Sequence, residues 1–202
     1  MSRDGKATRQ RILESAGLLV MARGFGATSI DMVLDEAQVT KGAFFYHFKS
    51  KAQLAVALAE SYTEQNDRFF AACAKAADRR HKDPLDRMLG YLDELADAFE
   101  KRPAAPGCLF AAFCYEADIF DKSLRRFMSQ QMRLWRDHHL RRLEQIARKH
   151  PPYVEIDLGQ LADAFLAAIE GGYVLGRVHG DTAAVARAVR QHRQYLEFVF
   201  DA

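Results

Sequence analysis

Hydrophobic side chains recur three and four residues apart along most of the chain, which is the period of an amphipathic α-helix. Most of these stretches are bounded by capping residues, glycine or proline, and no stretch alternates in the manner of a β-strand. The pattern predicts helices over residues 8–23, 29–37, 41–47, 51–77, 84–101, 108–117, 122–149, 157–177 and 182–200. We therefore expect an all-α fold.

The stretch from residue 28 to residue 48 has the layout of a helix-turn-helix. Thr28 is positioned to cap its first helix, with Asp31 as the partner in a capping box, and Thr40 is positioned to cap the second. The second helix is too short to be stable alone. We expect Phe44 and Phe48, which lie one turn apart, to hold it against the rest of the fold.

The opposite face of the second helix carries a cation, a glycine and aromatic rings. Lys41 lies one turn from Phe45, and Gly42 lies one turn from Tyr46. A lysine suits phosphate or guanine, a glycine permits a close approach, and aromatic groups suit thymine methyls and sugars. This face is therefore expected to enter the major groove of DNA.

Residues 28–54, with the core VTKGAFFYHFKSKAQL, resemble the DNA-binding domain of TetR/AcrR-family transcriptional regulators. The resemblance implies a three-helix DNA-binding head over residues 1–50. It also implies a helical-bundle body for ligand binding and dimerisation over residues 51–202, which makes about nine helices in total. The implied function is that of a dimeric repressor that binds a pseudo-palindromic DNA operator and is released by a small-molecule effector.

The expected DNA contacts follow from the helix-turn-helix and from this resemblance. They are Thr28, Thr40, Lys41, Gly42, Ala43, Phe45, Tyr46, His47 and Lys51. Lys51 begins a helix behind a second capping box, Ser50 to Gln53, and the positive end of a helix dipole suits a phosphate. His47 has two interpretations, a phosphate contact or a packed histidine. The family often has a phosphate-binding tyrosine where this chain has Phe45, so Phe45 is expected to contact a thymine methyl or a sugar instead.

Composition agrees with a globular DNA-binding protein. The chain has 202 residues, 49% of them hydrophobic, and a net charge of +2. Residues 1–51 hold eight basic and five acidic residues, so positive charge gathers where a phosphate-binding module would need it. No signal peptide or membrane span is visible, and three cysteines do not make a disulfide framework. We expect a cytoplasmic protein without membrane contact. Residues 2–7 read either as a mobile basic arm or as plain terminal disorder.

The resemblance further implies an effector cavity between the long helices of the body. The expected lining residues are Phe69, Phe99, Cys108, Phe113, Met128, Trp135 and Tyr173. Their character predicts an apolar or aromatic effector, although aromatic residues are core by default. Cys108 follows a Pro-Gly pair and is expected at a helix N-terminus, where the dipole favours the reactive thiolate. It would then be alkylated faster than Cys73 or Cys114. The alternative is a small buried side chain.

The predicted helix over residues 157–177 is apolar on more than one side, which indicates burial from two directions, and the last predicted helix ends in a very apolar stretch. We expect them to form a four-helix bundle with a second copy of the chain across a two-fold axis. The expected interface residues are Leu161, Phe165, Ile169, Gly172, Val189, Leu196 and Val199. The alternative is an internal pair of helices within one chain.

No motif for catalysis or for a cofactor is present, since the chain has no Gly-rich phosphate loop, nucleophile elbow or CxxC. His138 and His139 are adjacent and so face different sides of a helix, whereas a helical metal pair needs a spacing of four residues. We therefore expect neither an enzyme nor a metal or cofactor site.

Two rival functions come from other classes of protein. One is a DNA-binding protein of this fold that responds to a protein partner. The other is a ligand-binding helical protein with a vestigial head, against which the intact Lys41, Gly42, Tyr46 and Lys51 argue.

Overall fold

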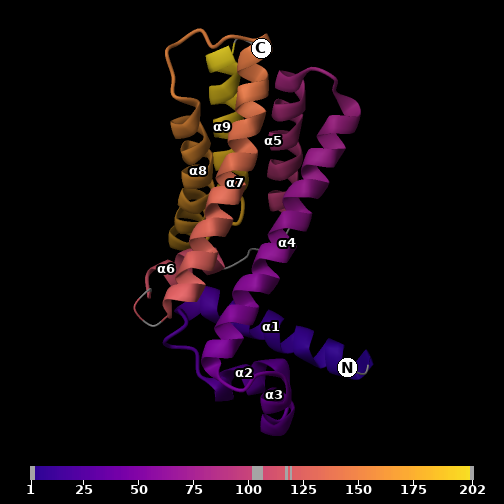
Figure 1. Cartoon of the computed structure of the whole chain (residues 1–202), viewed down its shortest axis with the longest axis vertical. Coiled ribbons are helices and arrows are strands. Elements are labelled where there is room, and N and C mark those ends of the chain that lie inside the picture. Colours follow the sequence, from indigo (N-terminus) through magenta and orange to yellow (C-terminus); the bar gives the residue numbers. More distant parts are fainter. Residues whose placement is uncertain (1–2, 102–106, 117, 119, 201–202) are drawn as a thin grey trace. The chain divides into compact units, whose positions relative to one another are not determined.

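The computed structural model describes residues 3–101, 107–116, 118 and 120–200, and over these residues it contains helices and no strand (Figure 1). The helices are α1 (Arg3–Arg23), α2 (Ile30–Ala37), α3 (Lys41–His47), α4 (Lys51–Arg80), α5 (Pro84–Lys101), α6 (Leu109–Cys114), α7 (Lys122–Lys149), α8 (Leu158–His179) and α9 (Ala184–Phe200). The all-α prediction is confirmed. The first helix starts at Arg3, so most of the predicted N-terminal arm is helical. Within the described ranges, no helix is both long enough and apolar enough to cross a bilayer.

The helices form two compact units. Unit 1 comprises Met1–Gln65 and Ala105–Ser129, and it holds α1 to α3, the first half of α4, and α6. Unit 2 comprises Asn66–Ala104 and Gln130–Ala202, and it holds the rest of α4 with α5, α8, α9 and most of α7. This division differs from the expected domain boundary at residue 50, because the continuous helix α4 contributes to both units and α6 belongs to unit 1 with the DNA-binding head.

Unit 1 has an aromatic cluster beneath the turn that follows α1. The Phe25 ring lies 5.5 Å from that of Phe113 and 5.0 Å from that of Phe120, and the last two rings are 4.6 Å apart, centroid to centroid. All three side chains are buried. The cluster ties α6 and the segment after it to the α1–α2 turn, with edge-to-face and tilted contacts that aromatic rings prefer.

Capping residues explain where α2 and α3 begin. Ser29, not Thr28, caps α2 by accepting a hydrogen bond from the Met32 amide at 3.1 Å. The prediction for Thr28 is wrong by one residue, because its buried hydroxyl donates to the Gly24 carbonyl at 2.7 Å. Thr40 caps α3 as predicted, by accepting from the Ala43 amide at 3.2 Å.

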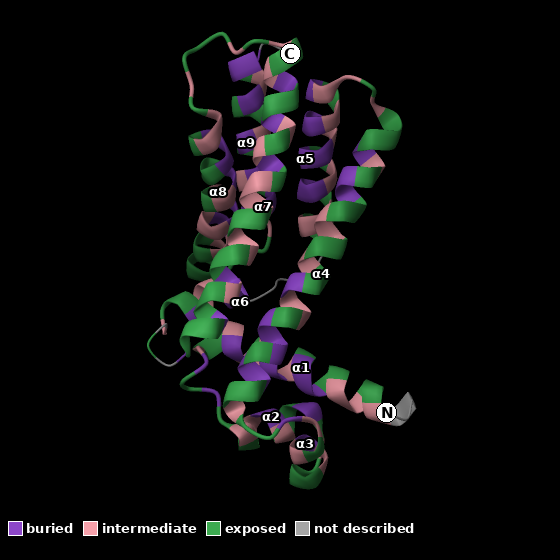
Figure 2. Ribbon diagram, viewed as in Figure 1, coloured by how far each residue is buried: buried purple, intermediate pink, exposed green. Residues whose placement is uncertain are grey.

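Unit 2 is a helical bundle around one hydrophobic core. The hydrophobic stripe of α5 lies inside, and Figure 2 shows this side of the helix as buried. Gly172 of α8 lies against the backbone of Val185 of α9, where an added Cβ would come within 2.7 Å of the Val185 Cα. The two helices therefore approach closely within one chain.

This packing bears on the residues expected at a dimer interface. All seven are buried within a single chain, namely Leu161, Phe165, Ile169, Gly172, Val189, Leu196 and Val199. They belong to the internal α8–α9 pair that the sequence allowed as the alternative. Their side chains expose 6% or less of their surface, so they offer little area to a second copy.

Candidate functional site

Helix α3 has one buried face and one exposed face. Phe44 and Phe48 are 0% and 1% exposed, and their rings lie 5.7 Å apart. The prediction that they hold this short helix in place is confirmed. Lys41, Gly42 and Tyr46 are exposed on the other face.

The exposed face of α3 has no evident role within unit 1. A Cβ at Gly42 would meet only the Thr40 Oγ1, at 3.9 Å, so packing among the described residues does not require glycine there. Tyr46 is 67% exposed, which is unusual for a large aromatic side chain in a helix. Exposed aromatic and cationic groups beside a glycine form a surface suited to an external partner.

The flanking residues predicted to contact DNA differ in their exposure. Thr40 is exposed, Ala43 and Phe45 are half-buried, and Thr28 is buried. His47 is half-buried, with its ring 5.0 Å from Tyr46 and 6.3 Å from Phe48. Burial, and after it the cation of Arg9, lowers the pKa of His47.

Lys51 takes part in a contact that the sequence did not reveal. Its Nζ donates to the Gly26 carbonyl at 3.2 Å and lies 4.5 Å from the centre of the Phe25 ring. Glu116 binds the same turn from the other side, by accepting from the Gly26 amide at 2.5 Å. Burial lowers the pKa of Lys51, and Glu116 opposes that shift. No sequence pattern pointed to Glu116, which is 90 residues from Gly26 along the chain.

The start of α4 is fixed by the predicted capping pair. Ser50 Oγ accepts from the Gln53 amide at 3.1 Å, and Gln53 Oε1 accepts from the Lys49 amide at 2.6 Å. Lys51 therefore stands at a defined helix N-terminus, where the dipole is positive.

The residues predicted to line an effector cavity fall into the two units. Cys108, Phe113 and Met128 are buried in unit 1. In unit 2 the ring of Phe99 lies between those of Phe69, at 5.2 Å, and Tyr173, at 6.4 Å. These six side chains are therefore not brought together around one space inside either unit.

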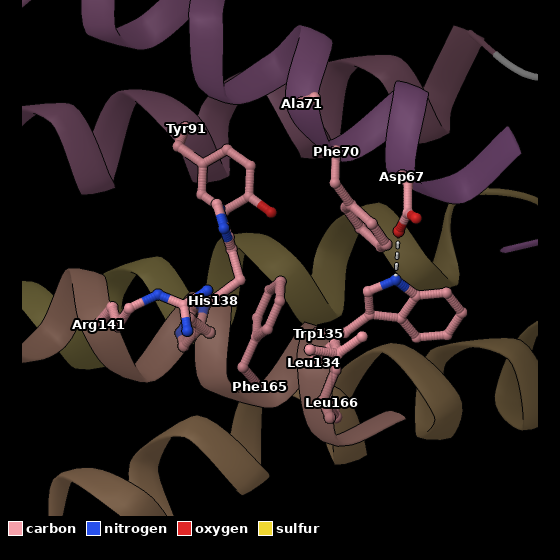
Figure 3. A pocket seen from close by; sticks show the side chains of 11 residues that line it. Asp67, Phe70, Ala71, Tyr91, Leu134, Trp135, His138, Arg141, Phe165 and Leu166 are labelled. Atoms are coloured by element: carbon pink, nitrogen blue, oxygen red, sulfur yellow. Dashed lines mark hydrogen bonds between the residues drawn. The ribbon is translucent and has the colours of Figure 1, made fainter. Parts of the chain in front are cut away.

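Trp135, the seventh of these residues, lines a cavity of about 270 Å³ in unit 2 (Figure 3). The walls come from α4, α5, α7 and α8. Trp135 Nε1 donates to Asp67 Oδ1 at 2.7 Å, and its ring lies 6.1 Å from that of Phe70. The Tyr91 hydroxyl points toward Phe70 (Figure 3). Phe70 and Tyr91 were not predicted to line the cavity, because the hydrophobic stripe of one helix does not show which other helices it packs against.

A buried histidine pair lies against this cavity. His139, which lines it, is 1% exposed, and its Nε2 is 3.3 Å from the Nε2 of His192. The His139 ring stacks on Phe165 at 3.9 Å. Burial lowers the pKa of His192 to about 4 and the pKa of His139 well below its usual value, helped there by His192 and nearby cations. His192 lies on the apolar stripe of α9, which was the available signal for its burial.

The three cysteines differ in exposure, which bears on their expected order of reactivity. Cys108 does stand at the N-terminus of α6, but it is buried, as is Cys73, whereas Cys114 is exposed. Because alkylation needs access as well as thiolate, we expect Cys114 to be labelled first in the native protein. Residue-resolved mass spectrometry after brief iodoacetamide treatment measures this. Faster labelling of Cys108 would contradict it and restore the original prediction.

No group of three or more metal-binding side chains occurs among the described residues. The described residues therefore form no candidate metal centre. The candidate sites are the exposed face of α3 in unit 1, for DNA, and the cavity in unit 2, for a ligand.

Two family models match the chain. Residues 12–58 match bacterial regulatory proteins of the tetR family, and residues 84–192 match the tetracyclin repressor-like C-terminal domain. The chain is 25% identical over 174 residues to a helix-turn-helix transcriptional regulator of Lactococcus lactis, covering 86% of this chain and 85% of that protein. It is 25% identical over 126 residues to the transcriptional repressor NemR of Escherichia coli, covering 62% of each. A TetR transcriptional regulator from Chloroflexus aurantiacus has a similar structure, with a TM-score of 0.78, 25% identity and 96% of each chain covered.

Proposed function

Because the chain belongs to the TetR family of transcriptional regulators, we propose that it is a repressor which binds a pseudo-palindromic operator as a homodimer and is released by a small-molecule effector. The family is one of regulators rather than enzymes. The observation that carries the proposal is the Lys41–Gly42–Tyr46 face of α3, which is exposed and, among the described residues, needs no glycine at position 42 for packing.

In this proposal α3 enters the major groove. Lys41 contacts phosphate or guanine, Gly42 allows a close approach of the DNA, and Tyr46 packs on a sugar or a thymine methyl. Thr40 and Phe45 flank this contact. Lys51 supplies positive charge at the start of α4, whereas the buried Thr28 supports the fold from inside.

Replacing Lys41 by alanine tests the DNA contact. We expect operator affinity to fall about tenfold and the slope of log affinity against log salt to become shallower by about one, because one phosphate contact is lost. The operator is first selected from random DNA, and binding is then measured by fluorescence anisotropy over a range of salt concentrations.

Lys75→Ala is the matched control, because Lys75 is also exposed on a helix but belongs to unit 2. It should keep the affinity and salt slope of the original protein. An unchanged slope for Lys41→Ala, or an equal loss for both variants, would contradict the proposed contact.

The homodimer is supported by apolar side chains left exposed on the last two helices. On α8 these are Val174, Leu175 and Val178, and on α9 they are Tyr195 and Phe198, with exposures from 43% to 72%. A Cβ at Gly171 of α8 would meet nothing within 4 Å, so a partner helix would have room to approach. We propose that this surface, the outer α8–α9 face, binds a second copy.

Effector control is supported by the cavity in unit 2. α4 contributes Asp67, Phe70 and Ala71 to its wall, and the same continuous helix begins at Lys51. A ligand that displaces this wall would move α4 and change the spacing of the two heads, which a pseudo-palindrome does not tolerate.

A further inference from the structure

The cavity in unit 2 is shaped for flat rings. Its walls include Phe70, Tyr91, Trp135 and Phe165, and Figure 3 shows these side chains around one space. An apolar cavity of about 150 Å³ is enough to hold benzene. The cavity here, at about 270 Å³, therefore admits a ligand of one or two fused aromatic rings.

One buried polar atom at this cavity lacks a partner. His139 Nε2 is occupied by His192, and His139 Nδ1 has no hydrogen-bond partner among the described residues. When the His192 Nε2–H donates to His139, the neutral His139 ring carries its own proton on Nδ1 and becomes a donor. An unsatisfied buried donor is costly, so a ligand acceptor would satisfy it.

Positive charge surrounds one end of the cavity. Arg141 is exposed, lines the cavity and makes no ion pair within the described part of the chain. It also lines a neighbouring polar cavity of about 320 Å³ together with Arg87, Arg142 and Asp78. Nη1 and Nη2 of Arg142 donate to Asp78, at 3.2 and 3.1 Å, which leaves Arg87 and Arg141 without a carboxylate partner there. The local charge therefore favours an anion.

The one carboxylate of the aromatic cavity does not reverse this preference. Asp67 accepts the Trp135 Nε1–H at 2.7 Å and lies across the cavity from Arg141 (Figure 3). The remaining polar groups at the cavity are mainly donors: the Tyr91 hydroxyl, His139 Nδ1, the Arg141 guanidinium and the Nδ1–H of His138, whose Nε2 accepts from Arg142 at 3.5 Å.

From these contacts we infer that the cavity binds a flat aromatic carboxylate of one or two rings. The rings lie among Phe70, Tyr91 and Trp135, and the carboxylate lies toward Arg141 and accepts from His139. The inference rests on the proposed function in one respect, because it takes this cavity to be the effector site. It adds the chemical class of the ligand.

Calorimetric titration of the full chain with three matched probes tests the inference. The probes are 2-naphthoate, its neutral amide, and the cationic 2-naphthylmethylammonium. We expect naphthoate to bind at least about tenfold more tightly than the amide, since a hydrogen bond to a charged group is worth that much or more, and the cation to bind most weakly.

Three variants locate the binding. Arg141→Gln should weaken naphthoate about tenfold and leave the amide unchanged, whereas Arg133→Gln, an exposed arginine on the same helix, should change neither. Ala71→Leu, at an exposed wall position, should fill the cavity and weaken both probes. The inference is overturned if naphthoate gives no heat of binding at millimolar concentration, if the amide or the cation binds as tightly, or if Arg141→Gln and Ala71→Leu are both without effect.

Operator binding in the presence of each probe separates this inference from the proposed function. Naphthoate that binds as expected but leaves the protein on DNA supports the ligand class and contradicts effector control by this cavity. Release from DNA by other compounds, with naphthoate failing to bind, contradicts the ligand class and leaves the proposed function intact.

Discussion

Lowering the pH from 6.5 to 4 is expected to remove about 3 kcal/mol from the free energy of unfolding of unit 2. Burial lowers the pKa of His192 from 6.5 to about 4, and it lowers that of His139 in the same direction. The unfolded chain therefore binds more protons than the folded one throughout this range. Stability is complete above pH 6.5 and falls as the pH drops toward the folded pKa.

Urea denaturation at several pH values measures this loss. The fluorescence of Trp135, the only tryptophan in the chain, reports on unit 2. His192→Gln should make the dependence between pH 6.5 and 4 shallower without abolishing it, because the amide can still donate to His139 but does not titrate, whereas His139 still does. His179→Gln, at an exposed histidine on α8, should keep it. Equal slopes for the original protein and His192→Gln would contradict the expectation.

A carboxylate, Asp83, contributes to the free energy of unfolding over a separate and lower pH range. Asp83 accepts from Lys149 at 2.5 Å and lies 2.9 Å from His150, and these contacts hold its pKa well below the usual value of 3.8. Its contribution is present above pH 3.8 and is lost as the pH falls further. Measurements that stop at pH 4 therefore leave out most of the Asp83 contribution.

Local features of the fold were predictable because short-range interactions determine them. The Thr40 cap and the Ser50–Gln53 pair each depend on residues within a few positions. One local error, Thr28 in place of Ser29, arose because two capping residues are adjacent. The Thr28 hydroxyl donates to the Gly24 carbonyl four residues earlier, which leaves Ser29 to cap the helix.

Features that need two distant segments were not predictable. When a helix such as α8 is apolar on two sides, its sequence does not show which side packs against its own chain. The structure buries Phe165 and exposes Val178, because α9 packs on one side only. Likewise, the sequence placed His139 on a helix but could not show that His192, 53 residues away, lies against it. The candidate DNA surface could be predicted because all of its central residues lie on one short helix, α3, and no distant segment is needed to form it.

A glutamate on the outer α8–α9 face is expected to convert the dimer into a folded monomer. Val178 and Phe198 are 71% and 72% exposed in the single chain, so Val178→Glu and Phe198→Glu leave its core intact. In a two-fold dimer each substitution would bury two carboxylates, one from each copy, and an unpaired buried charge costs several kcal/mol. We expect dimer affinity to fall by at least about a hundredfold, since 1.4 kcal/mol corresponds to a factor of ten.

Light scattering after size exclusion gives the mass, and circular dichroism shows whether each variant is folded. Tyr153→Glu is the matched control, because Tyr153 is 73% exposed but lies in the loop between α7 and α8. It should remain dimeric. Phe165→Glu should instead lose helical structure, because that side chain is 3% exposed and stacks on His139.

The outer-face variants, the loop control and Phe165→Glu together show whether the outer or the inner face of α8 and α9 binds the second copy. Folded monomers from Val178→Glu and Phe198→Glu should also lose operator affinity, because one head alone covers half of a pseudo-palindrome. If both variants keep the mass of a dimer, the second copy binds elsewhere on the chain. If the original protein is itself a monomer that binds its operator, the homodimer is not part of its mechanism.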